Sequence, residues 1–147
     1  MNKNKYISCG LAKKIDKVVE EKKVELPKSE YYWDAERDIL FMMADLMSNI
    51  GIPFCTYSAY DTYELGRMIP YTIKRDNRIY YLEQKQNYYR SEERISFELY
   101  YNSISEIKGK YDNQILDLPI QEKTEVEARG KLLLYLLENN LIKQTNE

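Results

Sequence analysis

The chain contains no histidine and only five glycines, four prolines, two cysteines and one tryptophan among its 147 residues. The lack of histidine excludes a Ser-His-Asp triad, a Cys-His pair and any zinc or iron site with histidine ligands. The few glycines are scattered and match neither the GxxxxGK[ST] nor the GxGxxG phosphate-binding pattern. Most of the common catalytic and nucleotide-binding motifs are therefore excluded, and no cofactor is indicated.

Cysteine and long apolar runs are scarce as well. Cys9 and Cys55 belong to no Cys-x-x-Cys pair, so we expect two reduced cysteines rather than a disulfide framework or a zinc site. The longest apolar run, residues 39–44, is far shorter than the roughly 20 residues of a membrane-spanning helix. No signal-peptide pattern opens the chain. The sequence therefore predicts a cytoplasmic protein that does not bind membranes.

Charge is unevenly distributed, although the formal net charge is only -2. Residues 1–28 are rich in lysine, whereas residues 29–65 contain a single base, Arg37, among many acids. The length suits one main domain. We expect a basic N-terminal helix within residues 1–28, able to move separately, and one α+β domain over residues 29–147.

Hydrophobic periodicity and capping residues predict the order of the elements. Residues 11–25 form a helix that Pro27 ends. Ser29 caps a second, longer helix that runs to Ile50. A strand over residues 54–60, a loop over 61–70, a hairpin of 71–74 with 78–83, a strand over 94–102 and a helix over 125–139 follow.

This order predicts the α+β class. An antiparallel sheet of three to five strands packs against the N-terminal helices and a closing C-terminal helix. Gly130 lies inside the closing helix, where glycine is unfavourable, so we expect a close helix–sheet contact at this position.

The first candidate for a functional surface is a row of carboxylates on the predicted second helix. Glu30, Asp34 and Asp38 are four residues apart, which places them on one helix face. Three interpretations remain open: a solvated face, a surface that competes for the basic groove of a nucleic-acid-binding protein, and a divalent-metal site. Asp61 and Glu64 extend this acidic part of the chain.

The second candidate is tyrosine, which occurs 15 times against three phenylalanines. Four Tyr-Tyr doublets occur, and a doublet in a strand places one ring in the core and one outside. Tyrosine gives a large contact area at low entropic cost, so Tyr80 and Tyr100 are candidate anchors for a partner. The alternative is that tyrosine replaces phenylalanine at the edge of the core.

Two segments resemble small proteins of Firmicutes phages, namely residues 33–40 (WDAERDIL) and residues 124–140 (TEVEARGKLLLYLLENN). In particular, the chain is similar to the phage ABA-sandwich domain, in which an early amphipathic helix, a central hairpin sheet and a closing helix form the layers. The resemblance covers residues 30–140. It implies a small accessory protein of a phage or mobile element, and it transfers no catalytic residue to this chain.

These observations support one leading hypothesis. The chain is a non-catalytic phage or mobile-element protein that occupies a basic groove on a host protein, such as a nucleic-acid-handling defence enzyme. It would thus be an anti-defence, anti-CRISPR-like inhibitor. Its binding surface comprises Glu30, Asp34, Asp38, Asp61, Glu64, Tyr80 and Tyr100.

Two alternatives remain. One is a small nucleotide- or nucleic-acid-binding domain that uses Arg75, Arg78, Tyr80 and Tyr81, although the pI of about 5.4 argues against direct nucleic-acid binding. The other is a metal-assisted hydrolase on Asp34 and Asp38. The oligomeric state is left open, a homo-oligomer included.

Overall fold

The computed structural model describes residues 3–42, 56–75, 77–104, 111–114 and 120–142. Within these ranges the chain forms a short 3₁₀ helix, three α-helices and eight strands. In chain order they are η1 (Lys3–Lys5), α1 (Cys9–Lys22), β1 (Tyr31–Asp34), β2 (Ile39–Met42), β3 (Thr56–Ser58), α3 (Thr62–Met68), β4 (Thr72–Arg75), β5 (Arg78–Tyr89), β6 (Arg94–Ile104), β7 (Tyr111–Gln114), β8 (Ile120–Glu122) and α4 (Glu125–Glu138). The predicted α+β class is confirmed.

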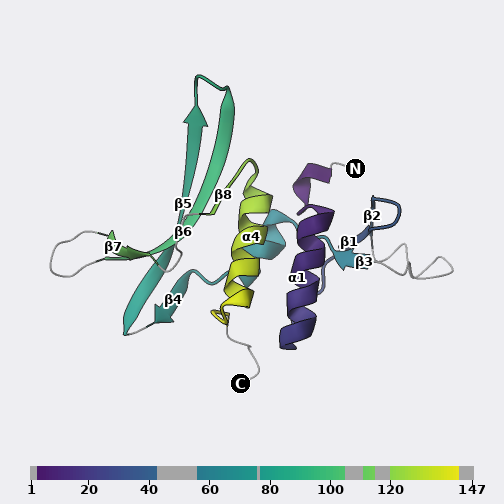
Figure 1. The fold of residues 1–147 in the computed structure, drawn as a ribbon, viewed down its shortest axis with the longest axis horizontal. Helices are drawn as coiled ribbons and strands as arrows, with labels where there is room; N and C mark the ends of the chain where they lie inside the picture. The colour runs from purple at the N-terminus through teal and green to yellow at the C-terminus, as the bar shows by residue number, and fades with distance from the viewer. Residues whose placement is uncertain (1–2, 43–55, 76, 105–110, 115–119, 143–147) are drawn as a thin grey trace.

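The strands form two antiparallel sheets. The smaller sheet has the order β2-β1-β3, and the larger one runs β4-β5-β6-β7, with β8 paired to β6 as well. β5 and β6 form a long hairpin whose register is continuous from Tyr81 opposite Asn102 to Tyr89 opposite Arg94. Figure 1 shows the far part of this hairpin extending beyond the helices, and we call residues 84–97 the arm.

The helices lie between the two sheets. α1 packs against β3 of the smaller sheet and against α4, and α4 packs on β6 and β8 of the larger sheet (Figure 1). This order of sheet, helices and sheet differs from the helix–sheet–helix layers that the phage-domain resemblance implies. No helix in the described ranges combines the length and the apolar character needed to cross a membrane.

The two long helices form at the predicted places. Leu11, Ala12 and Ile15 of α1 belong to the same buried core as the leucines of α4, so the basic helix is part of the main core. A Cβ atom at Gly130 would lie 2.6 Å from Cδ2 of Leu11 and 2.7 Å from Cγ2 of Ile7. The expected close contact at this glycine therefore exists, but its partners are Leu11 of α1 and Ile7 just before α1, and not a sheet.

The predicted second helix is wrong over its described part. Residues 31–42 form the hairpin of β1 and β2, with Trp33 opposite Leu40. Consecutive Tyr-Tyr-Trp residues favour a strand, and an Asp that bonds to the backbone two or three residues ahead favours a turn. These local preferences outweigh the helical spacing of the apolar residues. Residues 43–50 lie outside the described ranges.

The remaining predictions are mostly confirmed. The strand over residues 54–60 is found as β3, with residues 54 and 55 outside the described ranges, and the hairpin and the strand over 94–102 are found as β4, β5 and β6. The loop predicted over 61–70 is wrong, because α3 forms there. Asp61 caps this helix, since its Oδ1 accepts the N–H of Glu64 at 2.7 Å. Cys9 is a free cysteine.

Candidate binding groove beside strand β4

The predicted row of three carboxylates does not form. The side chain of Asp34 is only 6% exposed, and its Oδ1 accepts the N–H groups of Glu36 and Arg37, at 3.1 and 3.3 Å. Asp38 lies in the turn before β2 with a positive φ of 52° and pairs with Lys3. Glu30 is exposed just before β1. Because Asp34 holds the turn, it is not available to a partner.

Asp61 and Glu64 also have local roles. Asp61 caps α3, and Glu64 is half-buried near Ser29 and Glu30. Burial raises the pKa of Glu64, and its Oε2 has no hydrogen-bond partner. Among the described residues, no three Asp, Glu, Cys or His side chains are grouped in a way that could hold a metal ion.

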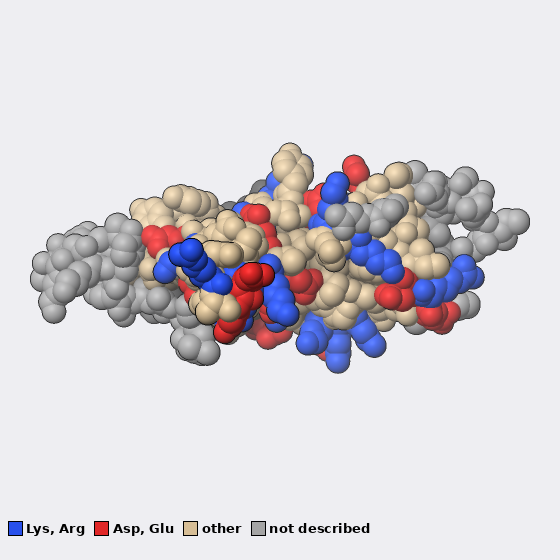
Figure 2. Space-filling model, turned by 90° about the horizontal axis from the view of Figure 1, so that it is seen from above, with Lys and Arg blue, Asp and Glu red and all other residues tan. Residues whose placement is uncertain are grey.

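Charged groups of both signs are intermingled on the surface seen in Figure 2. Lysine and arginine side chains lie beside aspartate and glutamate side chains across this face, rather than gathering into one acidic area. Among the described residues, this face of the molecule carries no single acidic area.

In the larger sheet, the doublets at 80–81 and 100–101 each place one ring in the core, as predicted, whereas Tyr88 is 64% exposed and Tyr89 lies outside the core cluster. The two named anchors are not both exposed. Tyr80 is 8% exposed and belongs to the core, so its assignment as an exposed anchor is wrong. Tyr100 is half-buried. Tyr81 lies on the outer face, where its ring meets that of Tyr71 edge-on at 6.2 Å. Burial of Tyr80 also removes one ring from the proposed nucleic-acid surface.

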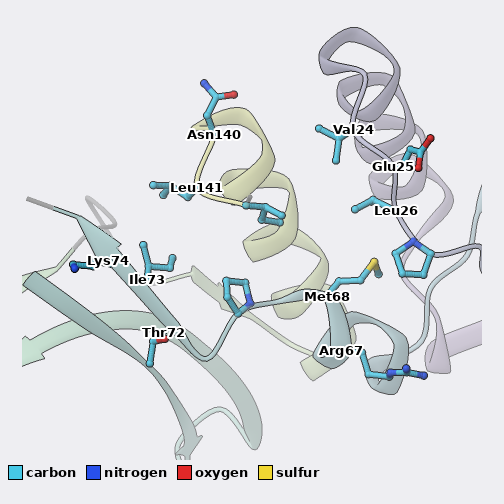
Figure 3. A pocket seen from close by; sticks show the side chains of 13 residues that line it. Val24, Glu25, Leu26, Arg67, Met68, Thr72, Ile73, Lys74, Asn140 and Leu141 are labelled. Atoms are coloured by element: carbon cyan, nitrogen blue, oxygen red, sulfur yellow. The ribbon is translucent and has the colours of Figure 1, made fainter. Parts of the chain in front are cut away.

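The described residues enclose an apolar pocket of about 590 Å³ that the sequence did not indicate. It lies between the ends of α1 and α4, the end of α3, and β4 (Figure 3). We call it the groove. Its apolar lining residues are Val24, Leu26, Pro27, Met68, Pro70, Ile73, Leu141 and Ile142, and its polar or charged ones are Glu25, Arg67, Thr72, Lys74 and Asn140.

Two helix ends of the same kind build one side of the groove. Lys23, directly after α1, and Asn140, two residues after α4, both have a positive φ, of 54° and 56°. After each end, one apolar residue folds back: the N–H of Val24 donates to the carbonyl of Val19, and the N–H of Leu141 donates to that of Leu136. This is the Schellman arrangement, which places an apolar residue against the last turn of the helix.

A lysine holds the two helix ends together. Nζ of Lys22 donates to the carbonyl oxygen of Glu138 at 2.7 Å and to Oδ1 of Asn140 at 2.9 Å. A cation at the C-terminus of a helix also interacts favourably with the helix dipole. This contact fixes the separation of α1 and α4 on that side of the groove.

The opposite side of the groove is the edge of the larger sheet. β4 is the terminal strand, and no described strand pairs with its outer side. The N–H of Leu82 donates to the carbonyl of Tyr71, so those two residues form a hydrogen-bonded pair. Bonded and non-bonded pairs alternate in an antiparallel ladder. Along the register of β4 with β5, the backbone groups of Thr72 and Lys74 therefore point away from β5.

Two cations flank the groove. Lys74 lies on β4 and Arg67 on α3, on different sides of the opening in Figure 3. Both side chains are exposed, and the guanidinium of Arg67 lies 5.7 Å from the ring centre of Tyr63. Glu25 is the one carboxylate in the described lining. The groove therefore combines apolar walls, outward-facing backbone groups and a net positive rim.

A second pocket, of about 460 Å³, lies at the N-terminal ends of α1 and α4. The N-cap of α1, Ser8, already has a partner there, because the carboxylate of Glu127 accepts hydrogen bonds from its backbone N–H and its hydroxyl. Cys9 lines the same pocket, and burial raises the pKa of its thiol, which disfavours the reactive thiolate. This pocket is a weaker candidate than the groove.

The groove combines a largely apolar lining, an edge strand without a described partner on its outer side, and a net positive rim. The sequence does not indicate the groove, because Lys23 stands where glycine or asparagine would signal a helix end, and because the position of β4 at the sheet edge is a tertiary property. Comparison of the chain with protein-family models, with curated proteins and with solved structures finds no match.

Proposed function

We propose that this chain is a non-catalytic binding protein that accepts an extended segment of a partner protein in the groove, where the segment adds a strand to β4. The observation that carries this proposal is that the outward backbone groups of Thr72 and Lys74 border an apolar pocket. Strand addition uses main-chain hydrogen bonds for affinity and pockets for side-chain selectivity.

The lining also defines the chemistry of the segment. Side chains of a strand alternate between its two faces, so every second residue of the segment is apolar and enters the groove. Arg67 and Lys74 favour a carboxylate at the ends of the segment. The proposed ligand is thus an extended apolar stretch that carries Asp or Glu, and it differs from the basic surface that the sequence alone favoured.

The origin of this segment in a host protein, and specifically in a defence enzyme, stays a prediction that comes from the sequence resemblance alone. The carboxylate row that supported a basic host groove has lost its geometric basis, since Asp34 is buried. We therefore still propose a non-catalytic binding protein, and we assign the binding surface to the groove.

A displayed library of random peptides tests the proposal directly. We expect selection on the full chain to enrich apolar, β-branched sequences with at least one acidic residue. The double variant Arg67→Glu, Lys74→Glu should bind a selected peptide at least about tenfold more weakly by fluorescence anisotropy, which corresponds to about 1.4 kcal/mol. The matched control is Lys14→Glu, Lys17→Glu, which makes the same charge change on exposed positions of α1. Equal loss in both, or no enriched class, would overturn the proposal.

A proline substitution tests the strand-addition geometry. Thr72→Pro removes an N–H that points away from β5 and is therefore not needed by the sheet, and proline is tolerated on edge strands for this reason. Thr72→Val keeps the N–H and serves as the control. We expect the selected peptide to bind the valine variant normally and the proline variant weakly, with both variants folded by circular dichroism.

A further inference from the structure

A second unpaired sheet edge lies on the arm, away from the groove. β5 has 12 residues, but β4 pairs only with its first part. The last register pair is Thr72 with Tyr81, and the last hydrogen bond runs from the N–H of Leu82 to the carbonyl of Tyr71. Beyond that point no described strand lies on this side of β5. Residues 83–89 therefore form an open edge seven residues long. Near its start, Oε1 of Gln84 still accepts a hydrogen bond from Arg129 of α4, and Figure 1 shows the far end of β5 extending beyond the helices.

The alternation of hydrogen bonds shows which residues present their backbone at this edge. Tyr80 and Leu82 bond toward β4, so the odd-numbered residues from Tyr81 to Tyr89 bond toward β6, in a register without a break. The N–H and carbonyl groups of Gln84, Gln86 and Tyr88 consequently point outward. This edge contains no proline and no bulge in the pairing with β6, both of which block edge pairing, and its charged residues are Glu83 and Lys85.

We propose that two copies of this chain associate through this edge, with β5 of one copy antiparallel to β5 of the other across a two-fold axis. A two-fold axis relates two identical strands that pair in antiparallel orientation and in a symmetric register. Pairing of all seven open residues places Gln86 on the axis, opposite Gln86 of the second copy. Gln84 then lies opposite Tyr88, and Lys85 opposite Asn87.

The side chains in this register fit a second copy. A residue on a two-fold axis must complement itself, and the glutamine side chain does so because its amide has both donors and acceptors. No residue of like charge is placed opposite another, since Lys85 faces Asn87 and Glu83 faces Tyr89. Tyr88, which is 64% exposed, gains Gln84 of the second copy as a neighbour on the same face.

A foreign peptide fits this edge less well than a second copy. Neither of the two pockets described above includes a residue of β5, so the edge has no apolar hollow to select the side chains of an unrelated segment. The neighbouring residues are instead polar, with Gln84, Lys85 and Gln86 all exposed. This separates the arm from the groove, where β4 has such a hollow, and the dimer does not depend on the function proposed for the groove.

Single cysteines test the register. In a background with Cys9→Ser and Cys55→Ser, Gln86→Cys places two thiols opposite each other at the axis. The Cα atoms of a hydrogen-bonded antiparallel pair are about 5.5 Å apart, within the usual disulfide range. Mild oxidation should convert Gln86→Cys almost fully to a covalent dimer. Gln84→Cys should give little dimer alone, because its partner is Tyr88, and should cross-link when it is combined with Tyr88→Cys. Equal cross-linking of both single variants would overturn the register.

Sedimentation velocity tests the association without cross-linking. The unmodified chain should show a concentration-dependent dimer. Gln86→Pro removes the N–H that only the dimer uses and should raise the dimer dissociation constant about tenfold or more, since two hydrogen bonds at the axis are lost. Gln86→Thr keeps the N–H and should stay dimeric. A monomer at all concentrations, or a dimer that Gln86→Pro leaves intact, would overturn the proposal, and pairing through β4 instead would appear as a dimer sensitive to Thr72→Pro.

Discussion

Glu127, in the first turn of α4, accepts hydrogen bonds from the backbone N–H and the hydroxyl of Ser8, the N-cap of α1, although 119 residues separate the two. The spacing of Thr124 and Glu127 is that of a capping box, in which Glu127 would bond back to its own N-cap. Thr124 does accept the N–H of Glu127, but the carboxylate is directed to the other helix. One residue therefore connects the N-terminal ends of both long helices.

Loss of this contact should destabilise the fold. Glu127→Ala leaves the N–H of Ser8 without its partner and removes negative charge from the start of two helices, so we expect the free energy of unfolding to fall by about 1–2 kcal/mol. Urea denaturation followed by the fluorescence of Trp33, the single tryptophan, measures this change. Glu138→Ala, at the exposed C-terminal end of α4, should leave stability nearly unchanged. Equal effects of the two substitutions would contradict the assigned contact.

Gly130 should be intolerant of even one methyl group. Gly130→Ala gains about 0.5–1 kcal/mol of helix propensity, but its Cβ must displace the buried side chains of Ile7 and Leu11, and overpacking costs about 1–3 kcal/mol. The expected net result is a lower melting temperature. Gly10→Ala is the control, because a Cβ at Gly10 meets nothing within 4 Å. That variant should be as stable as the parent or more so, and a destabilised Gly10→Ala would show that crowding is not the cause.

The half-buried carboxylate of Asp16 should make stability depend on pH. Burial raises the pKa of Asp16 above its ordinary value of 3.8, although Oδ2 accepts the N–H of Ser58 at 2.9 Å. The folded chain therefore binds this proton more tightly than the unfolded chain does. The stabilising contribution of protonated Asp16 to the free energy of unfolding is fully present below pH 3.8. It is lost as the pH rises through the raised pKa of the folded state.

Asp16→Asn keeps an acceptor for Ser58 and removes the charge. We expect the stability of the variant not to fall with rising pH in the way that Asp16 causes in the parent. At pH 7 the variant should be at least as stable as the parent. Melting temperatures of the two proteins between pH 3.5 and pH 7 measure the difference, in which the other titrating groups cancel. If the parent gained stability relative to Asp16→Asn as the pH rose, the stated direction of the pKa shift would be wrong.

The parts of the fold that sequence patterns anticipate are those governed by local chemistry. The helix of residues 125–139 follows from the Thr124 cap and its apolar face, and the β4–β5 hairpin follows from its turn, in which Asn77 has a positive φ of 63°. The hairpin of β1 and β2 differs from the predicted helix because the apolar residues have helical spacing and Ser29 stands at a capping position, while the strand preference of residues 31–33 and the turn at Asp34 decide the structure. Its strands are also fixed by a distant contact, since the N–H of Ala59 donates to the carbonyl of Tyr31.

The two candidate surfaces, the groove and the open edge of β5, depend on tertiary structure more than the helices and hairpins do. The sequence pattern predicts that Asp34 is an exposed carboxylate on a helix, yet Asp34 is buried in the structure. The groove requires α1, α3, α4 and β4 to come together, and the open edge of β5 requires β4 to be short. Neither property is encoded in a local pattern, so neither could be read from spacing or composition.

The burial of Asp34 also changes how a charge-reversal experiment must be interpreted. Asp34→Ala leaves the N–H groups of Glu36 and Arg37 without their acceptor, and we expect a loss of about 1–3 kcal/mol in the free energy of unfolding. Asp34→Lys should cost more, because it places a cation at a buried position. Asp38→Asn should change stability little, since its side chain is 77% exposed and asparagine tolerates the positive φ. Thermal melts of the three variants measure this order. If Asp34→Lys were as stable as Asp38→Asn, the turn would not depend on Asp34, and the carboxylate would again be a candidate for partner binding.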